Sequence, residues 1–401
     1  MVYPLIVARA HFRSTDGFRV AWAWRQDEPV TADVLGSRAL NRATLERQLL
    51  LRRSDLPVLA TIEHLVGMQA QVPLNPYIGL WSRLERFDPD ELGRLLVDRE
   101  VVRIVAMRGT LHLVTADDCL LLRPLMQPVL DAELARHRDH GPALEGVDLS
   151  QVLAHAKTFV AERPRTGAEL RDEFAARFPD LDAPALAYAC RNMLAFVQVP
   201  PRGVWGRTGQ VTSTTAEAWL GRELVRQPSI DEVVLRYLGA FGPATVADVS
   251  SWSRLTGMRE VVERLRPRLR VFRDDRGRDL FDLPDAPRPD PDTPAPSRFL
   301  PEYDNVLLSH ADRSRFVLDE RQGQPWTAPI IHGTVLHDGT VAGTWHIERD
   351  RAAGATTLVV MHAGLSGRAQ ASVTAEGRRL LGFHESGAVS HDIRLTSMET
   401  T

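Results

Sequence analysis

Apolar positions recur at helical spacing along most of the chain, and short alternating segments rich in β-branched residues interrupt them. The clearest unit has helices expected over 149–162, 170–178 and 184–195, and strands over 197–199 and 209–213. Thr166, with Glu169 three residues later, forms a capping-box pattern at the start of the second helix. Three helices followed by a two-stranded hairpin predict a winged helix-turn-helix.

The same order of elements occurs after and before this unit. The later copy has helices over 229–241, 246–253 and 257–265, and strands over 269–273 and 279–283. The longer first copy has helices over 42–52, 57–66, 75–86 and 88–98, strands over 101–107 and 110–115, and a further helix over 117–137. Units that recur in one chain share buried faces with their neighbours, so three tandem winged helices are expected.

A proline-rich segment, PDAPRPDPDTPAPS, follows the third unit and predicts a stiff, extended linker. Beyond it, Asp338-Gly339 marks a hairpin turn, ATTLVVMHA reads as a partner strand, and a helix is expected near 369–382. We predict an α+β fold in which three winged helices precede a small antiparallel β-rich domain. The expected boundaries are an N-terminal extension 1–34, units at 35–147, 148–227 and 228–284, a linker 285–297 and a C-terminal domain 298–401.

The extension 1–34 is aperiodic and contains the aromatic run FRVAWAW. We expect it to be poorly ordered, or alternatively to form a short β-hairpin on the core. No continuous apolar region suits a signal peptide or a membrane span.

The composition excludes several kinds of chemistry but does not identify one. The 401 residues carry a net charge of −3, which excludes a uniformly basic coat but leaves room for a local basic face. Two cysteines, far apart in sequence, exclude a disulfide framework and a cysteine-based zinc site, and fit a reducing cytoplasm. Lys157 is the single lysine, so chemistry that needs an amine nucleophile has one candidate. Motifs for nucleotide or metal cofactors are missing from the sequence, and we expect no cofactor.

The segment GMQAQVP joins a helix to a turn and holds two candidate catalytic residues, Gln69 and Gln71. In an extended segment residues i and i+2 point the same way, so the two amides would face one space. An amide accepts and donates hydrogen bonds but does not ionise near neutral pH, so this pair suits the positioning of a water rather than strong general-base catalysis. The alternative is that both residues simply cap the end of the helix.

Four ordered blocks, SRALNRATLERQLLLRR, GMQAQVPLNPYIGLWSRL, MRGTLHLVTADD and FLPEYDNVLLSHADRSR, resemble the winged-helix DNA-binding family that contains the AlkZ-type DNA glycosylases. The resemblance spans about residues 36–395. It implies a C-shaped clamp on DNA and catalysis by a Gln–apolar–Gln motif, which here is Gln69, Ala70 and Gln71. The glutamine in the last position resembles the branch associated with bulky alkyl adducts and interstrand crosslinks, whereas the broader-specificity branch carries aspartate there.

The chemistry of the residues agrees with this resemblance. N7- or N3-alkylated purines are cationic, so their glycosidic bonds are already weak, and a positioned water with electrostatic guidance is adequate. We therefore expect a monofunctional DNA glycosylase of base excision repair, acting as a monomer on double-stranded DNA that carries alkylated or crosslinked purines. Lys157 lies far in sequence from the glutamines, so a lyase step through a Schiff base is not expected.

Contacts to DNA are expected from the hairpin around 108–112, the middle wing, the third unit and the start of the C-terminal domain. The nine arginines between 254 and 278 face only four acidic residues, which suits phosphate contact. The candidate DNA-binding residues are Arg108, Thr110, His112, Arg202, Arg207, Arg273, Arg276, Asn305 and Arg313.

Each of these assignments has a plainer alternative. Arg108-Gly109 would be a solvated turn, His112 a satisfied sheet histidine, and the arginine cluster a solvated surface from a GC-rich genome. Asp304 and Arg313 would form a structural ion pair. For the whole protein, the alternatives are a transcription regulator with tandem winged helices, or a catalytically silent relative that binds damaged DNA.

Overall fold

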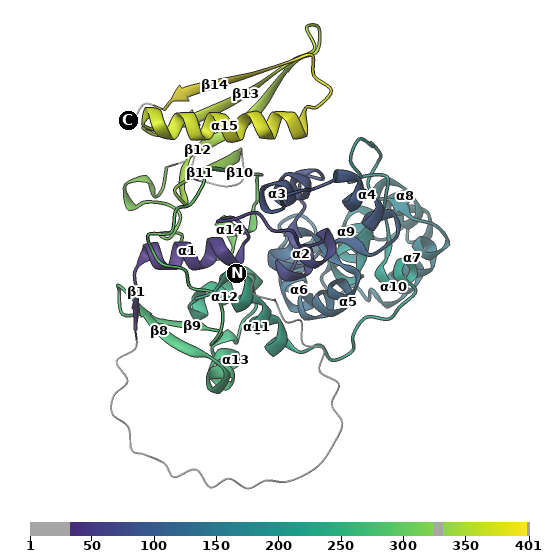
Figure 1. The fold of residues 1–401 in the computed structure, drawn as a ribbon. Coiled ribbons are helices and arrows are strands. Elements are labelled where there is room, and N and C mark those ends of the chain that lie inside the picture. The colour runs from purple at the N-terminus through teal and green to yellow at the C-terminus, as the bar shows by residue number, and fades with distance from the viewer. Residues whose placement is uncertain (1–32, 325–326, 328–331, 399–401) are drawn as a thin grey trace, which may run out of the picture. The chain divides into compact units, whose positions relative to one another are not determined.

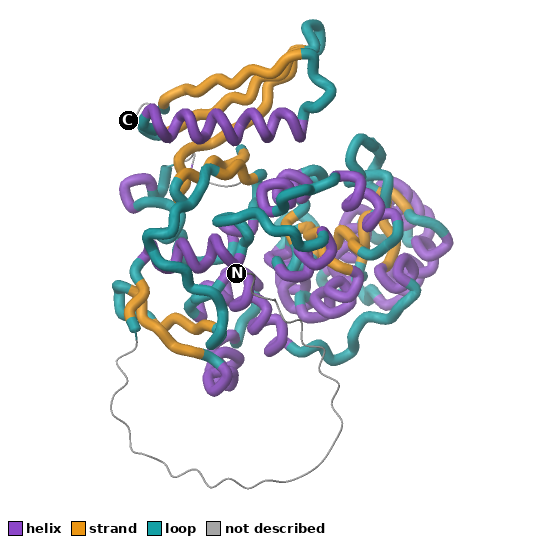
Figure 2. The backbone as a smooth tube through the Cα atoms, viewed as in Figure 1, coloured by secondary structure: helices purple, strands orange, loops and turns teal. Residues whose placement is uncertain are grey.

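Fifteen helices and three sheets make up the part of the chain that the structure describes, which is residues 33–324, 327 and 332–398 of a computed structural model (Figures 1 and 2). The helices are α1 Ser37–Arg47, α2 Val58–His64, α3 Asn75–Arg83, α4 Pro89–Val97, α5 Ala116–Leu125, α6 Gln127–Arg136, α7 Ser150–Glu162, α8 Gly167–Arg177, α9 Ala183–Met193, α10 Ala216–Leu220, α11 Ile230–Phe241, α12 Val246–Ser253, α13 Met258–Leu265, α14 Asn305–Leu308 and α15 Gly367–His384. The strands are β1 Val34–Leu35, β2 Met68–Gln69, β3 Val101–Val105, β4 Leu111–Thr115, β5 Arg165–Thr166, β6 Phe196–Gln198, β7 Thr212–Thr215, β8 Arg270–Asp274, β9 Asp279–Asp282, β10 Arg298–Leu300, β11 Gly333–His337, β12 Thr340–Asp350, β13 Ala355–His362 and β14 Ser390–Ser397. Within these described ranges, no helix is long and apolar enough to cross a membrane.

A six-stranded sheet in the order β2-β4-β3-β6-β7-β5 runs through the first two predicted units. The hairpin β3–β4 is antiparallel, and β3 also pairs with β6, where Arg103 lies opposite Gln198. The hairpin β6–β7 confirms a two-stranded element in the middle unit, although its second strand begins at Thr212, three residues later than predicted. The two units therefore share one sheet.

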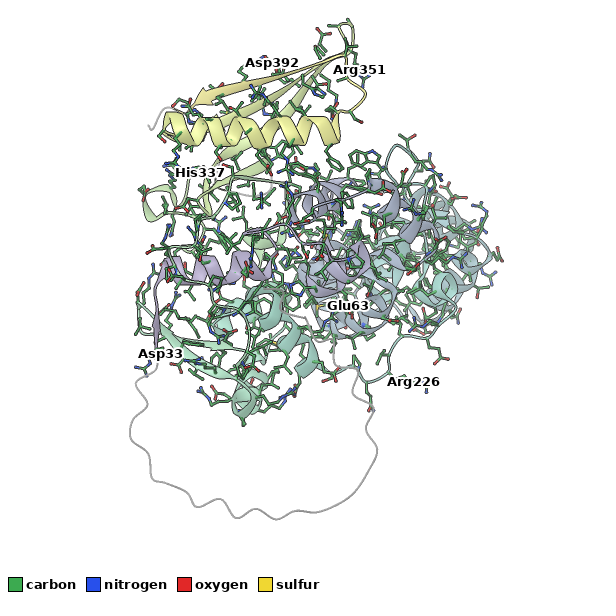
Figure 3. All side chains as sticks on the ribbon, in the orientation of Figure 1. Asp33, Glu63, Arg226, His337, Arg351 and Asp392 are labelled. Carbon is green, nitrogen blue, oxygen red and sulfur yellow. The ribbon has the colours of Figure 1, made fainter. Side chains whose placement is uncertain are left out.

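The second sheet has three strands in the order β1-β8-β9. Its hairpin β8–β9 matches the predicted strands of the third unit to within one residue at each end. β1 adds to it in parallel, with Val34 opposite Arg273. Asp33, labelled in Figure 3 just before β1, pairs through its carboxylate with Arg270 at 2.6 Å. Val34, the last residue of the extension that was expected to be poorly ordered, therefore belongs to this sheet, and Asp33 contacts it through a backbone hydrogen bond to Arg273. Residues 1–32, including FRVAWAW, lie outside the described part of the chain.

The third sheet, β10-β11-β12-β13-β14, lies in the predicted C-terminal domain. Asp338 and Gly339 have φ values of 45° and 80°, as a tight hairpin turn between β11 and β12 requires, and β13 is the expected antiparallel partner of β12. The prediction of an antiparallel sheet holds for β10 to β13 but not for β14, which pairs with β13 in parallel. Helix α15 makes the crossover between these two strands and runs along the sheet (Figure 1).

Local sequence signals predicted most helix starts correctly. Prolines and residues with positive φ explain the helix ends that were predicted in the wrong place. Thr166 and Glu169 form the predicted capping box of α8. The predicted helix 42–52 begins instead at Ser37 and stops at Arg47, because Leu49 has a φ of 58°. The predicted helix 117–137 is two helices, α5 and α6, since Pro124 and Pro128 each lack the N–H that a continuous helix would use.

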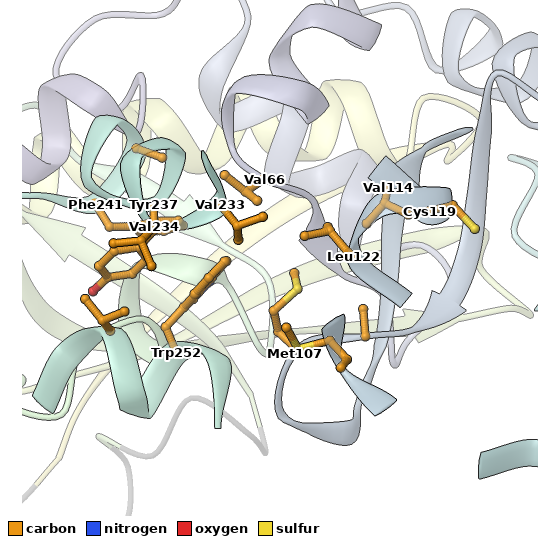
Figure 4. Packing of buried hydrophobic residues seen from close by; sticks show 14 of the residues in the cluster. Val66, Met107, Val114, Cys119, Leu122, Val233, Val234, Tyr237, Phe241 and Trp252 are labelled. Atoms are coloured by element: carbon orange, nitrogen blue, oxygen red, sulfur yellow. The ribbon is translucent and has the colours of Figure 1, made fainter. Parts of the chain in front are cut away.

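The largest apolar cluster joins residues of all three predicted units (Figure 4). Val66 and Val114 come from around the six-stranded sheet, while Tyr237 and Trp252 come from α11 and α12. The rings of Tyr237 and Trp252 lie 4.9 Å apart, and the buried Tyr237 hydroxyl donates to the carbonyl of Ser309 at 2.7 Å. A core shared in this way holds the turn after α2 against α12.

The proline-rich segment, predicted to be a stiff, extended linker, contains turns at 284–286 and 291–292, and it is not a free linker. The Arg42 guanidinium donates to the carbonyl of Thr293 at 2.6 Å, and Arg47 donates to the carbonyl of Pro287 at 3.2 Å. Arg47 also makes a buried, bidentate pair with Asp282 at 2.6 and 2.9 Å. Helix α1 therefore holds this segment against the third predicted unit, 228–284.

Candidate active site

The two candidate catalytic glutamines lie where the chain turns from α2 into β2. Val66 and Gly67 both have positive φ, 54° and 87°, which brings the chain sharply into the sheet. A Cβ on Gly67 would lie 2.7 Å from Val114 Cγ1, so this close approach needs glycine. Gln69 then pairs with His112 of β4 at the edge of the six-stranded sheet.

Gln69 is almost buried, with 6 % of its surface exposed, yet its side-chain oxygen and its backbone N–H have defined partners. Its side-chain Oε1 accepts from Arg108 Nη2 at 2.7 Å. Its backbone N–H donates to Asn305 Oδ1 at 3.4 Å, and Asn305 Nδ2 donates to the Gly67 carbonyl at 2.7 Å. The amide is therefore held by polar contacts and is not simply packed in the apolar core.

Arg108 lies in a tight turn, η1 (Met107–Gly109), with a φ of 59° that non-glycine residues rarely adopt. Besides Gln69, its guanidinium donates to the Trp252 carbonyl at 3.2 Å and lies 3.3 Å from His112 Nε2. Burial, and then the nearby Arg254, lower the pKa of Arg108 to about 10. Burial, and then Arg108, lower the pKa of His112 to about 3, so this histidine is neutral under ordinary conditions.

Gln71 follows two residues later and is exposed. Its Oε1 lies 3.5 Å from the backbone N–H of Leu111, a long contact that leaves the amide free to turn. Ala70 between the glutamines is fully buried, and its carbonyl accepts from Arg103 Nη2 at 3.0 Å. The turn therefore presents one restrained amide and one accessible amide.

Two grooves border this turn. The first, of about 770 Å³, includes Arg108 and Thr110 and adds three further arginines, Arg136, Arg138 and Arg254. The second, of about 580 Å³, begins at Val72 just after Gln71 and holds the predicted residues Arg202 and Arg207. Asn75, Glu302, Trp345, Ile347 and Arg349 also line the second groove.

Two of the predicted DNA-binding residues require correction. His112 is 1 % exposed and uses both ring nitrogens inside the protein, on Arg108 and on the Thr110 carbonyl. Asn305 is 7 % exposed, and its amide holds the backbone of the turn at Gly67 and Gln69. Neither side chain is available to DNA, and both instead support the glutamine turn.

The remaining candidates lie away from the glutamine turn. Arg276 pairs with Asp312 at 3.1 Å, Arg273 lies 3.6 Å from Asp279, and Arg313 donates to the carbonyl of Thr327 at 3.1 Å. Six arginines of the predicted cluster have a carboxylate within 4.0 Å, namely Arg264, Arg266, Arg270, Arg273, Arg276 and Arg278. Three of the partners, Asp33, Asp231 and Asp312, are distant in sequence, so they offset part of the local charge expected from the sequence.

The alternative ion pair between Asp304 and Arg313 is also wrong. Asp304 instead forms a bidentate pair with Arg83 of α3, at 2.8 and 2.9 Å, and both side chains are buried. No sequence signal indicated this pair or the groove residues Arg136 and Arg138. Arg254 was noticed only as a member of the cluster. The described residues include no group of three or more His, Cys, Asp or Glu side chains that suits a metal ion.

Comparisons with known proteins identify the class of enzyme. A solved structure, the Streptomyces sahachiroi DNA glycosylase AlkZ, has a similar fold, with a TM-score of 0.67 at 22 % identity over 90 % of this chain and 100 % of that chain. A family model described as "DNA glycosylase AlkZ-like" matches residues 62–383. The protein belongs to this AlkZ-like family and is a DNA glycosylase. A curated relative, the "Interstrand DNA cross-link repair glycosylase" of Streptomyces sahachiroi, is 26 % identical over 342 residues, which cover 76 % of this chain and 85 % of the relative.

Proposed function

We propose that this glycosylase hydrolyses the N-glycosidic bond of cationic alkylated purines, N7-alkylguanines above all, and that it unhooks interstrand crosslinks built from them. The observation that carries the proposal is the neutral pair Gln69 and Gln71, of which the second is exposed. Arg108, which contacts Gln69, lines one groove, and Val72, which follows Gln71, lines the other. The name of the curated relative, an interstrand crosslink repair glycosylase, points to the same class of lesion.

Amide side chains suit a substrate whose leaving group is already activated. A positive charge on the alkylated purine weakens the bond to C1′, and departure of the base leaves an oxocarbenium-like sugar. Gln69 and Gln71 position the attacking water but do not act as a general base, because an amide does not take up its proton. An uncharged base would need protonation by a general acid, which neither amide supplies.

We propose that the first groove binds the DNA backbone. Three of its arginines, Arg136, Arg138 and Arg254, face one carboxylate, Glu133, which already accepts a hydrogen bond from the Tyr188 hydroxyl at 2.9 Å. The fourth, Arg108, is left out of this proposal because its guanidinium is already held by Gln69, His112 and the Trp252 carbonyl. None of these arginines has a carboxylate within ion-pair distance among the described residues. Unpaired guanidinium groups in a groove are typical of phosphate contacts. Arg202 and Arg207 extend the same function to the second groove.

We further propose that the three helix-and-hairpin units are winged helices that hold double-stranded DNA as a clamp, together with the C-terminal domain, in a monomer. The boundaries are those expected from sequence, with units at 35–147, 148–227 and 228–284, a linker 285–297 and a C-terminal domain 298–401. The hairpins β3–β4, β6–β7 and β8–β9 support this assignment, because each follows a set of helices.

The rate of base release is expected to be nearly independent of pH between about pH 5 and about pH 9. The glutamines do not ionise, burial lowers the pKa of His112 to about 3, and the pKa of Arg108 is about 10 because of burial and Arg254. Single-turnover rates with enzyme in excess over N7-methylguanine DNA provide the measurement. A bell-shaped profile with a midpoint near neutrality would show that an ionising base carries the reaction.

No covalent adduct with DNA is expected on addition of borohydride, because a Schiff base needs an amine. Lys157 lies in α7 and pairs with Glu217 at 3.0 Å. Lys157→Ala should therefore release base at the wild-type rate, and gel analysis should find no trapped species. A trapped adduct in the wild type that disappears in the variant would establish a lyase step instead.

The proposed function is tested on duplexes that carry N7-methylguanine or a nitrogen-mustard crosslink. The expected products are free base and abasic sites from the first duplex, and separated strands after heating from the second. A duplex with unmodified guanine serves as the control and should stay intact. Tight binding without product from any cationic adduct would contradict the proposal and favour a silent DNA-binding relative.

A further inference from the structure

We propose that Arg108, held in place by His112, fixes the side-chain amide of Gln69 so that Gln69 donates to the reacting water and Gln71 accepts from it. Arg108 is then a positioning residue, acting through Gln69. This inference rests on the proposed function, and it assigns different tasks to two side chains of identical chemistry.

The orientation of the Gln69 amide follows from its partner. A guanidinium has only hydrogen-bond donors, so the atom 2.7 Å from Arg108 Nη2 must be the Gln69 oxygen. The opposite orientation would set two donors against each other. With Oε1 toward Arg108, the NH₂ group of Gln69 points away from the guanidinium and is the group left to contact a water.

The tautomer of His112 follows by the same argument. Its Nδ1 lies 2.9 Å from the Thr110 carbonyl, which only accepts, so Nδ1 carries the proton. Nε2 is then an acceptor, and it faces Arg108 Nη2 at 3.3 Å. Burial, and then Arg108, lower the pKa of this ring to about 3, so it stays an acceptor at any working pH.

Three acceptors from separate parts of the fold therefore hold one guanidinium. They are Gln69 Oε1, His112 Nε2 and the carbonyl of Trp252 in α12. Within the described ranges, no carboxylate lies within 4.0 Å of Arg108, so the contacts that orient it are directional hydrogen bonds and not an ion pair. The positive φ of Arg108 is unfavourable for a non-glycine residue, so the surrounding structure must hold its backbone in this conformation. This further restrains the guanidinium.

The division of tasks follows from what is left on each amide. Gln69 offers an N–H to the water oxygen. The exposed Gln71 oxygen makes only a 3.5 Å contact with the Leu111 N–H, so its second lone pair remains to accept from one water proton. The remaining lone pair of the water forms the bond to C1′ as the C1′–N bond breaks. The electron pair of that bond neutralises the charge on the departing purine, and the proton of the attached water passes to solvent.

The variant Gln69→Glu separates the two tasks, because it keeps the shape and the pairing with Arg108 but has no N–H. We expect its single-turnover rate on N7-methylguanine DNA to fall by about 100-fold or more. Gln151→Glu is the matched control, since Gln151 is exposed on α7 and the charge change is the same. It should react within about twofold of the wild type. Activity of Gln69→Glu within about threefold of this control would overturn the inference.

Arg108→Met tests the positioning role against a simple phosphate contact. We expect a rate about 10- to 100-fold lower at saturating enzyme, with the DNA Kd and its salt dependence unchanged. A phosphate contact alone would instead weaken binding and lower the slope of log K against log salt by about one, with an unchanged rate. That second pattern would overturn the assignment of Arg108.

Two measurements keep these outcomes interpretable. Thermal unfolding of each variant shows whether it is folded. If Arg108→Met does not fold, the isosteric Gln69→Glu variant alone tests whether Gln69 donates to the water. An inactive wild type on every cationic lesion would refute the proposed function itself. An active wild type with an equally active Gln69→Glu would refute only the donor role of Gln69.

Discussion

Replacing Gln69 or Gln71 with alanine is expected to lower the single-turnover rate of base release from N7-methylguanine DNA by about 10²- to 10³-fold. Each change removes one of the two amides that would hold the attacking water, and the loss of one preorganised hydrogen-bonding group typically costs this much. The double variant should fall little further, because the water has no defined site once either partner is lost.

The accompanying measurements separate catalysis from folding and binding. The DNA Kd of both variants, measured by fluorescence anisotropy, should stay within about threefold of the wild type, since the glutamines carry no charge. Gln151→Ala on the exposed face of α7 is the matched control and should be fully active. Unchanged rates in both Gln69→Ala and Gln71→Ala would show that this turn does not catalyse base release.

Asp304→Ala is expected to destabilise the protein by about 3–5 kcal/mol, the usual cost of breaking a buried ion pair. Asp304 accepts two hydrogen bonds from Arg83 at 2.8 and 2.9 Å, and it also caps α14 by accepting from the backbone N–H of Val306 at 3.1 Å. Its removal leaves a buried guanidinium without a counter-charge. The next residue, Asn305, anchors the glutamine turn, so activity should fall as well.

Urea unfolding of the variant provides the measurement, with Glu223→Ala as the control. Glu223 pairs with Arg226 at 3.2 Å, but both side chains are at least 80 % exposed. Exposed pairs contribute little, so the control should change the free energy of unfolding by less than about 1 kcal/mol. An equally small change for Asp304→Ala would mean that Arg83 finds another partner.

Local sequence signals predicted the parts of the fold that neighbouring residues determine. The capping box at Thr166, the turn at Asp338-Gly339 and most helices were found from spacing and turn chemistry alone. Pairings between distant segments were not found. Examples are β1 with β8, β3 with β6 and the parallel addition of β14, since each depends on packing across the whole molecule.

In the candidate site, too, the sequence predicted a local feature but not its long-range contacts. The sequence singled out Gln69, but two of its partners come from elsewhere. Asn305 lies 236 residues away, and Arg108 is held by a carbonyl 144 residues further along the chain. The sequence also gave His112 a contact with DNA, whereas burial turns this residue inward to hold Arg108. A histidine three residues after a turn glycine carries no signal that distinguishes these roles.

The account depends most on the claim that the charge of the lesion activates the bond and that two amides only position the water. The direct test compares N7-methylguanine with its 7-methyl-7-deaza analogue, which has the same shape and no positive charge. We expect both duplexes to bind with similar affinity, and base release only from the charged one. Release of the uncharged analogue at a comparable rate would contradict the account, because the enzyme would then have to supply a general acid that neither glutamine provides.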